Sequence, residues 1–329
     1  MAFHRIIEQV NAVALIERAL SHGRVPHAWL FSGMAHVGKF RTALTLAMSL
    51  NCLKIGNDAC GECDNCRQIE NEYFLDFQVV RPEGKNIRIS QVRETLDWLH
   101  LHPDRARYRV LIFDCADQMN HESANAFLKT LEEPPQRTLI ILVAASPQNL
   151  PETVISRCQH VRFKPLEIKK VKQILLEETE LDQNQAEMLA SYGRGCVRAD
   201  LANQVELVQN VQDSVIQWIG NMSPANMEDI FRSCAEWSKS KQEEWRLVLD
   251  ILETWFRDLA WLKQQLPEHR LLYPQRLGDL EKCSRHFSIQ SVYDFFRDLS
   301  EVRRSIELNA NRTLALESLW IRLKHYASA

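Results

Sequence analysis

The first half of the chain alternates short, almost purely apolar runs with longer stretches in which apolar residues recur every three or four positions. The apolar runs have the length of buried strands and cover residues 28–31, 77–80, 108–113 and 139–145. The longer stretches have the period of amphipathic helices and cover residues 40–50, 90–100 and 120–133. Strands and helices in alternation are typical of a parallel sheet covered by helices. Ser90 is the expected N-cap of the second helix, Pro134 stops the third, and 139–145 is the expected central strand.

The pattern changes near residue 165. Two short helices are expected between 165 and 207, around Gly193 and Gly195. Only Gly220 and Gly278 follow residue 207, which favours a mostly helical C-terminal third. Three apolar stripes at helical spacing lie there, and their tryptophans are expected to be core residues: 245–266, 289–306 and 316–326. We therefore predict an α/β domain over 1–165, a small helical domain over 166–207 and an all-α domain over 208–329.

The composition is that of a protein with substantial hydrophobic cores and no strong charge bias. With 329 residues, of which 45% are hydrophobic and 25% charged, the chain can form two or three domains. A net charge of −3 argues against a protein dedicated to binding nucleic acid, without excluding a local basic groove. The N-terminus has no apolar signal region, and no stretch approaches the roughly 18 apolar residues of a membrane span. We expect a cytoplasmic protein.

Four of the nine cysteines, Cys52, Cys60, Cys63 and Cys66, are crowded together with the spacing C-x7-C-x2-C-x2-C. Thiolates at these spacings can converge on one tetrahedral Zn²⁺, and a cytosolic chain is not expected to form disulfides. We predict a structural zinc module over 52–66, since four protein ligands leave no open position for catalysis. An iron–sulfur cluster and unligated thiols are the alternatives. The isolated cysteines are expected to be packing residues: Cys115, Cys158, Cys196, Cys234 and Cys283.

Residues 33–40, Gly-Met-Ala-His-Val-Gly-Lys-Phe, follow the phosphate-binding pattern G-x-x-x-x-G-K-[ST] except at the last position. Such a loop joins a strand to a helix, as the predicted elements on either side would do here. Its backbone N–H groups hold phosphates, its Lys reaches the β/γ-phosphates and its Ser/Thr binds Mg²⁺. Gly33, Gly38 and Lys39 are retained, whereas Phe40 has no oxygen for a metal ion.

The strand predicted at 108–113 ends at Asp114, where P-loop proteins place the carboxylate that holds the Mg²⁺-bound water. In many ATPases a Glu follows and orients the attacking water, but Cys115 follows here. An Asp at a strand end could equally cap a helix, and Lys39 could be a solvated lysine at a helix N-terminus. Taken with the loop, Asp114 indicates a degenerate nucleotide site.

Longer segments carry a resemblance to one protein family. Residues 124–135 read Ala-Asn-Ala-Phe-Leu-Lys-Thr-Leu-Glu-Glu-Pro-Pro, and residues 155–158 read Ile-Ser-Arg-Cys. Three further segments contribute, together with the cysteine module after the P-loop helix: 27–33, 195–201 and 311–323. In these segments the chain resembles the AAA+ clamp-loader subunits of bacterial DNA polymerase III. The resemblance covers nearly the whole chain and is weakest between 208 and 308.

This resemblance implies roles for regions and residues that the pattern alone does not assign. It implies that 166–207 is a helical lid and that 208–329 is an oligomerising collar. Arg198 matches the sensor-2 helix and joins the expected nucleotide-binding residues. Arg157 matches the arginine of the family's Ser-Arg-Cys motif, which projects into the ATP site of a neighbouring subunit. Without the resemblance, a surface ion pair would be the preferred interpretation of Arg157.

Departures from the family pattern indicate which kind of subunit this is. Motor subunits have Thr after the P-loop Lys, Glu after the Asp and polar residues at sensor 1. Here those positions hold Phe40, Cys115 and the pair 144–145, both alanine. The three losses fit a subunit without intrinsic catalysis, while Lys39 and Arg198 leave weak ATP binding open.

We therefore expect a stationary, zinc-containing subunit of the polymerase III clamp loader that supplies Arg157 to a neighbouring motor ATPase. Its implied partners are the gamma/tau motor subunits and the delta subunit, together with the sliding clamp and primed DNA. An active motor-type ATPase of the same family is one alternative, which the three departures oppose. A zinc-containing DNA-binding adaptor is another, opposed by the net charge and by the lack of a concentrated Arg/Lys-aromatic patch. A nucleoside-monophosphate kinase would share the P-loop, but it would explain neither 124–135 nor the collar.

Overall fold

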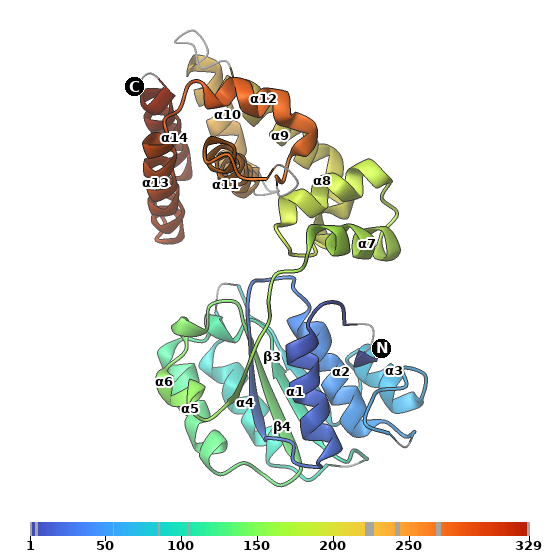
Figure 1. The fold of residues 1–329 in the computed structure, drawn as a ribbon. Coiled ribbons are helices and arrows are strands. Elements are labelled where there is room, and N and C mark those ends of the chain that lie inside the picture. Colours follow the sequence, from blue (N-terminus) through green and yellow to red (C-terminus); the bar gives the residue numbers. More distant parts are fainter. Residues whose placement is uncertain are drawn as a thin grey trace. The chain divides into compact units, whose positions relative to one another are not determined.

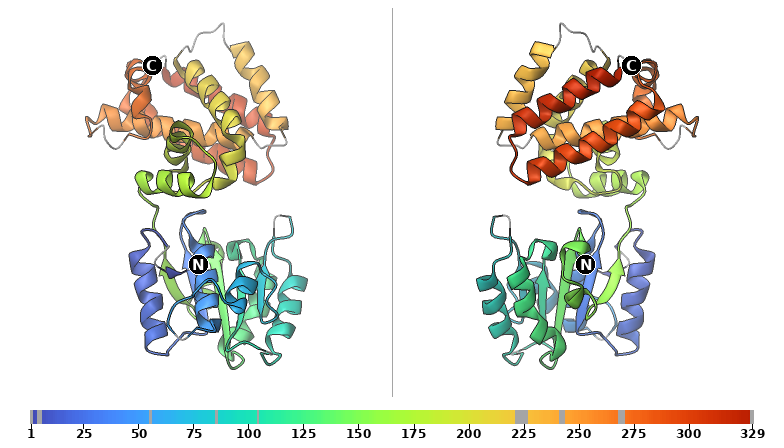
Figure 2. Two further views of the ribbon diagram at one scale, coloured as in Figure 1. Left: turned by 90° about the vertical axis from the view of Figure 1, so that its right-hand side faces the viewer. Right: turned by 90° about the vertical axis from the view of Figure 1, so that its left-hand side faces the viewer.

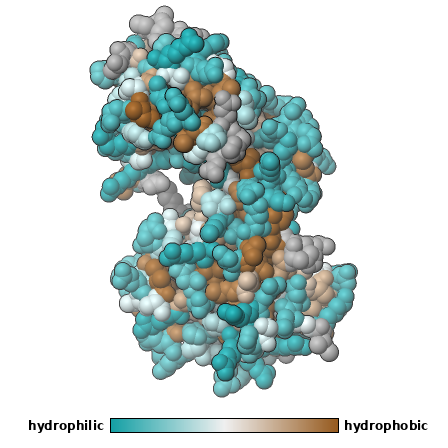
Figure 3. Space-filling view, viewed as in Figure 1, coloured by the Kyte–Doolittle hydropathy of each residue, from teal (hydrophilic) through white to brown (hydrophobic). Residues whose placement is uncertain are grey.

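A computed structural model of the protein describes residues 2–3, 6–54, 56–84, 86–103, 105–220, 227–240, 244–267 and 271–327. The chain forms two compact units. The first contains Met1–Val171 with Gly195–Val197, and the second contains Lys172–Arg194 with Arg198–Ala329. Within the described ranges, no helix combines the length and the apolarity needed to cross a membrane. The face shown in Figure 3 is mostly hydrophilic, with apolar residues gathered in patches.

The first unit is built on a five-stranded parallel sheet with the strand order β2-β3-β4-β1-β5 (Figure 1). The strands are β1 Ala28–Ser32, β2 Phe77–Val80, β3 Arg109–Phe113, β4 Thr138–Ala144 and β5 Gln159–Arg162. Every residue of β1, β3 and β4 is buried, as their apolar composition requires. The four predicted strands are thus confirmed, with β4 inside the sheet.

Helices cover both faces of this sheet (Figures 1 and 2). One hydrophobic cluster contains Trp29 and Phe31 with residues from α1 Val10–Ser21, α2 Lys39–Asn51 and α3 Asp64–Glu70. The other contains Leu30 with residues from α4 Ile89–Leu99, α5 His121–Glu132 and α6 Glu152–Ile155. Because successive side chains of a strand point to opposite faces, one apolar strand contributes to both cores. The α/β class predicted from the alternating pattern is confirmed.

The helix ends follow local capping rules, with one correction. The Asn120 side chain accepts a hydrogen bond from the Ser123 N–H at 2.8 Å, which fixes the start of α5. The predicted cap at Ser90 is wrong, since α4 already begins at Ile89. There the Arg88 N–H donates to the Gln91 side chain at 2.9 Å, so a glutamine in the first turn of the helix satisfies this backbone group.

The second unit is helical in its described residues. Its helices are the rest of α7 Ile168–Glu178, then α8 Gln183–Gly193, α9 Val205–Gly220, α10 Met227–Lys239, α11 Glu244–Lys263, α12 Leu277–Ser284, α13 Ile289–Glu307 and α14 Arg312–Ala327. Helix α11 contacts α8, α9, α10, α12 and α13, and its Trp255 and Phe256 are buried. The three predicted apolar stripes form α11, α13 and α14. The boundary between a lid at 166–207 and a collar at 208–329 stays a prediction.

Candidate functional site

The P-loop connects β1 to α2, and two glycines shape it. Gly33 has φ +141°, and a Cβ there would lie 2.5 Å from the carbonyl oxygen of Phe163, so no other residue fits. Gly38 has φ +93° and provides the left-handed residue from which α2 starts. The loop therefore has the backbone of a phosphate-binding turn, which requires glycine at these two positions.

Lys39 is directed into the loop itself. Its ammonium donates to the carbonyl oxygens of Gly33 at 2.7 Å and Met34 at 2.5 Å. Burial lowers the pKa of Lys39, although the carboxylates of Asp117 and Asp114 raise it. Lys39 is therefore a buried side chain with two acceptors, and the alternative of a solvated lysine is wrong.

Other parts of the first unit hold the outer carbonyls of the loop. The His36 carbonyl accepts from the Val197 N–H at 2.8 Å, and the Val37 carbonyl accepts from the Gln9 side chain at 3.3 Å. His36 itself has φ +58°, an uncommon value for a residue with a side chain. The loop is thus fixed by contacts with segments distant in sequence on both sides.

An arginine lies beside Phe40 and Asp114, the two positions that correspond to metal ligands in P-loop proteins. Phe40 packs against the core of the first unit, and the guanidinium carbon of Arg81 lies 5.1 Å from the centroid of its ring. Arg81 Nε lies 3.7 Å from Asp114 Oδ2, and the same guanidinium donates to both carboxylate oxygens of Glu72 at 2.7 and 2.5 Å. Burial raises the pKa of Asp114, whereas Arg81 and Lys39 lower it. Among the described residues, the Asp114 carboxylate therefore forms its ion pair with Arg81, to which the sequence assigned no role.

Sequence reasoning missed Arg81 and Glu72. A usable signal existed, because Arg81 directly follows a predicted strand, as Asp114 does. In the sheet, β2 and β3 are parallel neighbours with Val80 opposite Phe113, so the residues after both strands emerge together. Only the strand order, which the pattern does not give, was needed to place them side by side.

The two remaining departures lie at the same edge of the sheet. Cys115 follows Asp114 with φ +58°, and burial raises the pKa of its thiol, as do the Asp114 and Asp117 carboxylates. At the end of β4, the Asp117 carboxylate accepts from the N–H groups of Ala145 at 3.2 Å and Ser146 at 2.9 Å. The side chain after the Asp is thus a half-buried neutral thiol, and the sensor-1 pair has only methyl groups.

Arg157 lies in the turn between α6 and β5. Its guanidinium donates to the Thr153 carbonyl at 2.9 Å and to Glu132 Oε1 at 2.6 Å. Glu132 is the last residue of α5 and belongs to the Leu-Glu-Glu-Pro-Pro segment. The next residue, Cys158, packs against the second hydrophobic cluster. The half-buried Cys158 attaches the turn to this cluster, and Arg157, with a side chain 36% exposed, remains at the surface.

Arg198 belongs to the second unit. There its guanidinium pairs with Asp200 at 3.0 Å and lies 5.7 Å from the centroid of the Tyr192 ring. Its predicted part in nucleotide binding stays a prediction.

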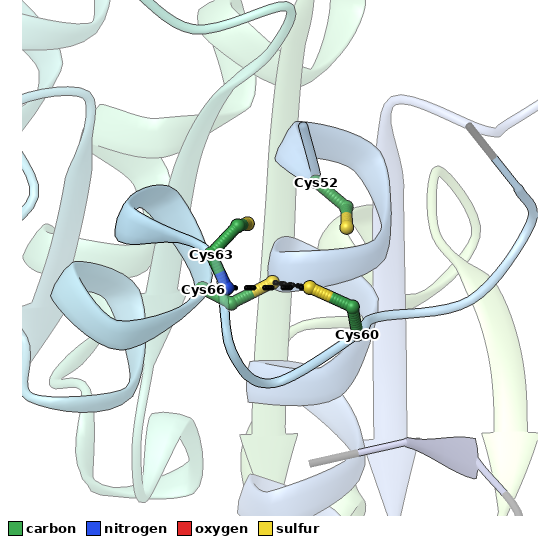
Figure 4. Close-up of side chains that lie close together, drawn as sticks. All are labelled: Cys52, Cys60, Cys63 and Cys66. Atoms are coloured by element: carbon green, nitrogen blue, oxygen red, sulfur yellow. Dashed lines mark hydrogen bonds between the residues drawn. The ribbon is translucent and has the colours of Figure 1, made fainter. Parts of the chain in front are cut away.

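The four cysteines predicted as metal ligands converge (Figure 4). Cys52 caps the C-terminus of α2, Cys63 precedes α3, Cys66 lies in its first turns, and Cys60 lies in the loop between the two helices. All four sulfurs lie within 4.8 Å of one another, and those of Cys60 and Cys66 are 3.9 Å apart. Thiolates around a tetrahedral ion with Zn–S bonds of about 2.3 Å would lie at similar separations, about 3.8 Å. The cluster could hold a metal ion.

Two backbone N–H groups stabilise the thiolate form of Cys60, the form that binds a cation. The Cys60 sulfur accepts hydrogen bonds from the N–H groups of Glu62 at 3.4 Å and Cys63 at 3.3 Å. Although burial acts in the opposite direction, these bonds hold the pKa of the Cys60 thiol at about 6. Burial raises the pKa of Cys66, which is fully enclosed. A cation bound here would compensate the negative charge of the Cys60 thiolate beside the buried Cys66.

A parallel sheet with helices on both faces and a phosphate-loop sequence between β1 and α2 defines an α/β domain of the P-loop type. The sequence places the protein more narrowly. Residues 8–167 match the family described as DNA polymerase III, delta subunit, and residues 201–325 match its C-terminal family. The chain belongs to the clamp-loader subunits of bacterial DNA polymerase III, which act in DNA replication.

Two relatives in sequence are themselves subunits of DNA polymerase III. The chain is 28% identical to subunit delta' of DNA polymerase III from Bacillus subtilis over 322 residues, 96% of each chain. It is 35% identical over 206 residues to subunit tau from Escherichia coli, which covers 61% of this chain but only 32% of tau. A gamma subunit-related protein from Thermotoga maritima aligns with a TM-score of 0.45 and 18% identity, covering 95% of this chain and 99% of that one.

Proposed function

We propose that the chain is the stationary, hydrolysis-deficient subunit of the clamp loader, which helps to load the sliding clamp on primed DNA. The observation that carries the proposal is Phe40 at the metal-ligand position of the P-loop, partly buried against the core and contacted by Arg81. A motor ATPase needs a hydroxyl at this position for Mg²⁺. A phenyl ring supplies no ligand for the ion.

The surroundings of Asp114 support the same proposal. Hydrolysis needs a group that orients the attacking water, and the next side chain is the Cys115 thiol, whose pKa is raised by burial. To reach a phosphate, Lys39 would have to leave the two loop carbonyls that it contacts. We therefore expect any ATP binding at Gly33, Gly38 and Lys39 to be weak.

Arg157 is the residue that we assign to a neighbour's chemistry. Its guanidinium is at the surface and is held at a defined point by Glu132 and the Thr153 carbonyl. An arginine supplied in trans neutralises charge on the transferred phosphoryl group and is worth roughly 10³–10⁵ in rate in well-studied systems. A surface ion pair alone would contribute only about 0–1 kcal/mol to stability. The position inside the Ser-Arg-Cys segment favours the trans role.

We assign the four-cysteine cluster to structural zinc. Four thiolates in mutual contact complete a tetrahedral shell, so no position is left for a catalytic water. The cluster links the end of α2 to α3, and its role would be to fix this module on the side of the sheet.

The partners follow from the family. We infer that the chain assembles with gamma/tau motor subunits and with delta through the region 208–329, in the cytoplasm where replication takes place. The clamp and primed DNA would then be contacted as parts of the whole complex. The long helices α13 and α14 are suited to association, since each leaves apolar residues exposed.

The test is ATP hydrolysis by the isolated chain and by complexes reconstituted with gamma/tau, delta, clamp and primed DNA. The isolated chain should hydrolyse no ATP. Arg157→Ala should lower the stimulated rate, by up to ~10³-fold at the one neighbouring site, and Arg157→Lys should restore little because an ammonium lacks the planar fork. Arg88→Ala, which removes an exposed arginine paired with Glu83, is the matched control.

Each of the two measurements has an outcome that would contradict the proposal. Turnover by the isolated chain at the rate of a motor subunit would overturn the hydrolysis-deficient role. Equal rates for the wild type and an assembled, folded Arg157→Ala complex would mean that Arg157 is only a surface residue.

A further inference from the structure

The carboxyl ends of β2 and β3 bring an arginine to the place where a P-loop protein holds its metal ion. Val80 pairs with Phe113, so Arg81 and Asp114 leave the sheet side by side. The Arg81 Nε lies 3.7 Å from Asp114 Oδ2, and its guanidinium carbon lies 5.1 Å from the centroid of the Phe40 ring. The two residues that correspond to metal ligands in this class are thus both contacted by one protein cation.

Contacts with Glu72 and Phe40 hold the Arg81 side chain in this position. Glu72 accepts two hydrogen bonds from the guanidinium, the paired geometry in which an arginine–carboxylate contact is strongest. The backbone of Glu72 has φ +62°, a conformation that residues with side chains rarely adopt. The phenyl face of Phe40 adds an attractive cation–π contact. Three different contacts therefore converge on one guanidinium.

The donor set does not fit Mg²⁺, the ion that the fold class implies. Mg²⁺ requires near-octahedral oxygen ligands. Phe40 provides none, Glu72 is occupied by Arg81, and the Asp114 carboxylate faces both Arg81 and Lys39. A divalent ion at Asp114 would also lie beside a guanidinium of the same sign, which repels it.

We propose that Arg81 is a resident cation that replaces Mg²⁺ beside Asp114 and excludes the metal from this site. The inference rests on the proposed role of Asp114 as the metal-side carboxylate. It goes beyond the loss of a ligand at Phe40, because it says that restoring the hydroxyl alone would not restore metal binding. The two changes are coupled, because the Phe40 ring, which stands where the hydroxyl would be, contacts the Arg81 guanidinium.

The experiment measures the affinity of the full-length chain for a fluorescent ADP analogue in Mg²⁺ and in EDTA. The variants are Phe40→Thr, which restores the hydroxyl, and Phe40→Thr/Arg81→Gln, which also removes the positive charge but keeps a hydrogen bond to Glu72. Phe40→Thr/Arg81→Lys retains a cation and is the matched control. Circular dichroism and metal content verify that each variant is folded.

Wild type, Phe40→Thr and the Arg81→Lys double variant should bind with the same affinity in Mg²⁺ and EDTA. Phe40→Thr/Arg81→Gln should bind more tightly in Mg²⁺, by about tenfold or more, the effect of a metal-supporting group. A gain in Phe40→Thr alone, or no gain in Phe40→Thr/Arg81→Gln, would overturn the proposal. Neither result would touch the hydrolysis-deficient role, which the ATPase assay on the wild-type chain decides independently.

Discussion

At the scale of single residues, the cysteine centre depends on one turn. Gly61, with φ +72°, follows Cys60 and lets the chain reverse so that the next two N–H groups on the far side point at the Cys60 sulfur. A residue with a Cβ rarely adopts this conformation. The same turn brings Cys63 and Cys66 back toward Cys52. The short ligand spacing is thus sufficient because a single glycine closes the loop.

Purified protein should contain one zinc ion per chain and show no iron–sulfur absorbance. Cys60→Ser should lose zinc and lower the melting temperature, because a serine hydroxyl is a poor replacement for a thiolate ligand. Acidification should release the metal as well, since protons compete with the cation for the thiolates, and binding is therefore present at high pH and lost as the pH falls. Metal analysis and thermal melts provide both measurements.

Cys115→Ser is the control for this prediction, because Cys115 is a free cysteine outside the cluster. It should keep the full zinc content. A brown protein, or a Cys60→Ser variant with unchanged zinc, would contradict a four-thiolate zinc site.

At the scale of elements, β2 and β3 are joined at the end opposite Asp114 by a buried ion pair. Asp76 precedes β2, Arg109 begins β3, and their side chains, 2.7 Å apart, are 0% and 5% exposed. Asp76 also accepts from the N–H groups of Arg105 and Ala106, and Arg109 donates to the carbonyls of Trp98 and His102. The pair therefore fixes the connection between α4 and β3 to the start of the neighbouring strand.

Asp76→Ala should lower the free energy of unfolding by about 3–5 kcal/mol, because it leaves the Arg109 charge buried without its partner. Glu83→Ala is the matched control, since it breaks an ion pair with Arg88 in which both side chains are exposed, and it should change stability by only about 0–1 kcal/mol. Urea unfolding followed by circular dichroism measures both variants. Equal midpoints would show that the Asp76–Arg109 pair does not hold the sheet.

The same elements show what the sequence could predict. Strands β1, β3 and β4 were found because both their faces are buried and their residues are almost all apolar. Strand β5 was missed because it lies at the sheet edge, where only Val161 of its residues is buried. The cysteine ligands were found because their spacing is local, whereas the contact of Arg81 with Asp114 depends on which strands are neighbours. Local chemistry is visible in a sequence, and chemistry set by strand order is not.

At the scale of the molecule, the second unit is held together by charges as well as by its core. Tyr192 on α8 donates to Asp250 on α11 at 2.8 Å, and Arg303 on α13 donates to Asp250 at 2.6 Å and Glu253 at 2.9 Å. Arg194, just after α8, also pairs with Glu253. Residues 172–194 are thus anchored to α11, whose carboxylates also bind Arg303 of α13, so the helices after residue 207 support the segment before it.

The last helix of this unit exposes two large apolar side chains in the described chain. Leu314 and Ile321 on α14 are 63% and 53% exposed. They are seven residues apart, close to two helical turns, so they lie on the same face. Buried residues Leu316, Leu319, Trp320 and Leu323 hold the other face of α14 in the unit. The outer face is therefore the part of the proposed collar that we expect to contact a neighbouring subunit.

Leu314→Glu/Ile321→Glu should weaken assembly with the gamma/tau and delta subunits while leaving this chain folded and zinc-loaded. Charges at the centre of an apolar contact must be desolvated on association, whereas at an exposed position of the free chain they cost little. Leu53→Glu/Leu101→Glu is the matched control, because both leucines are 60% exposed but lie in the first unit. Size-exclusion chromatography of mixtures at several concentrations measures the assembled fraction. Full assembly of the α14 variant, or an equal loss in the control, would show that this face of α14 is not the association surface.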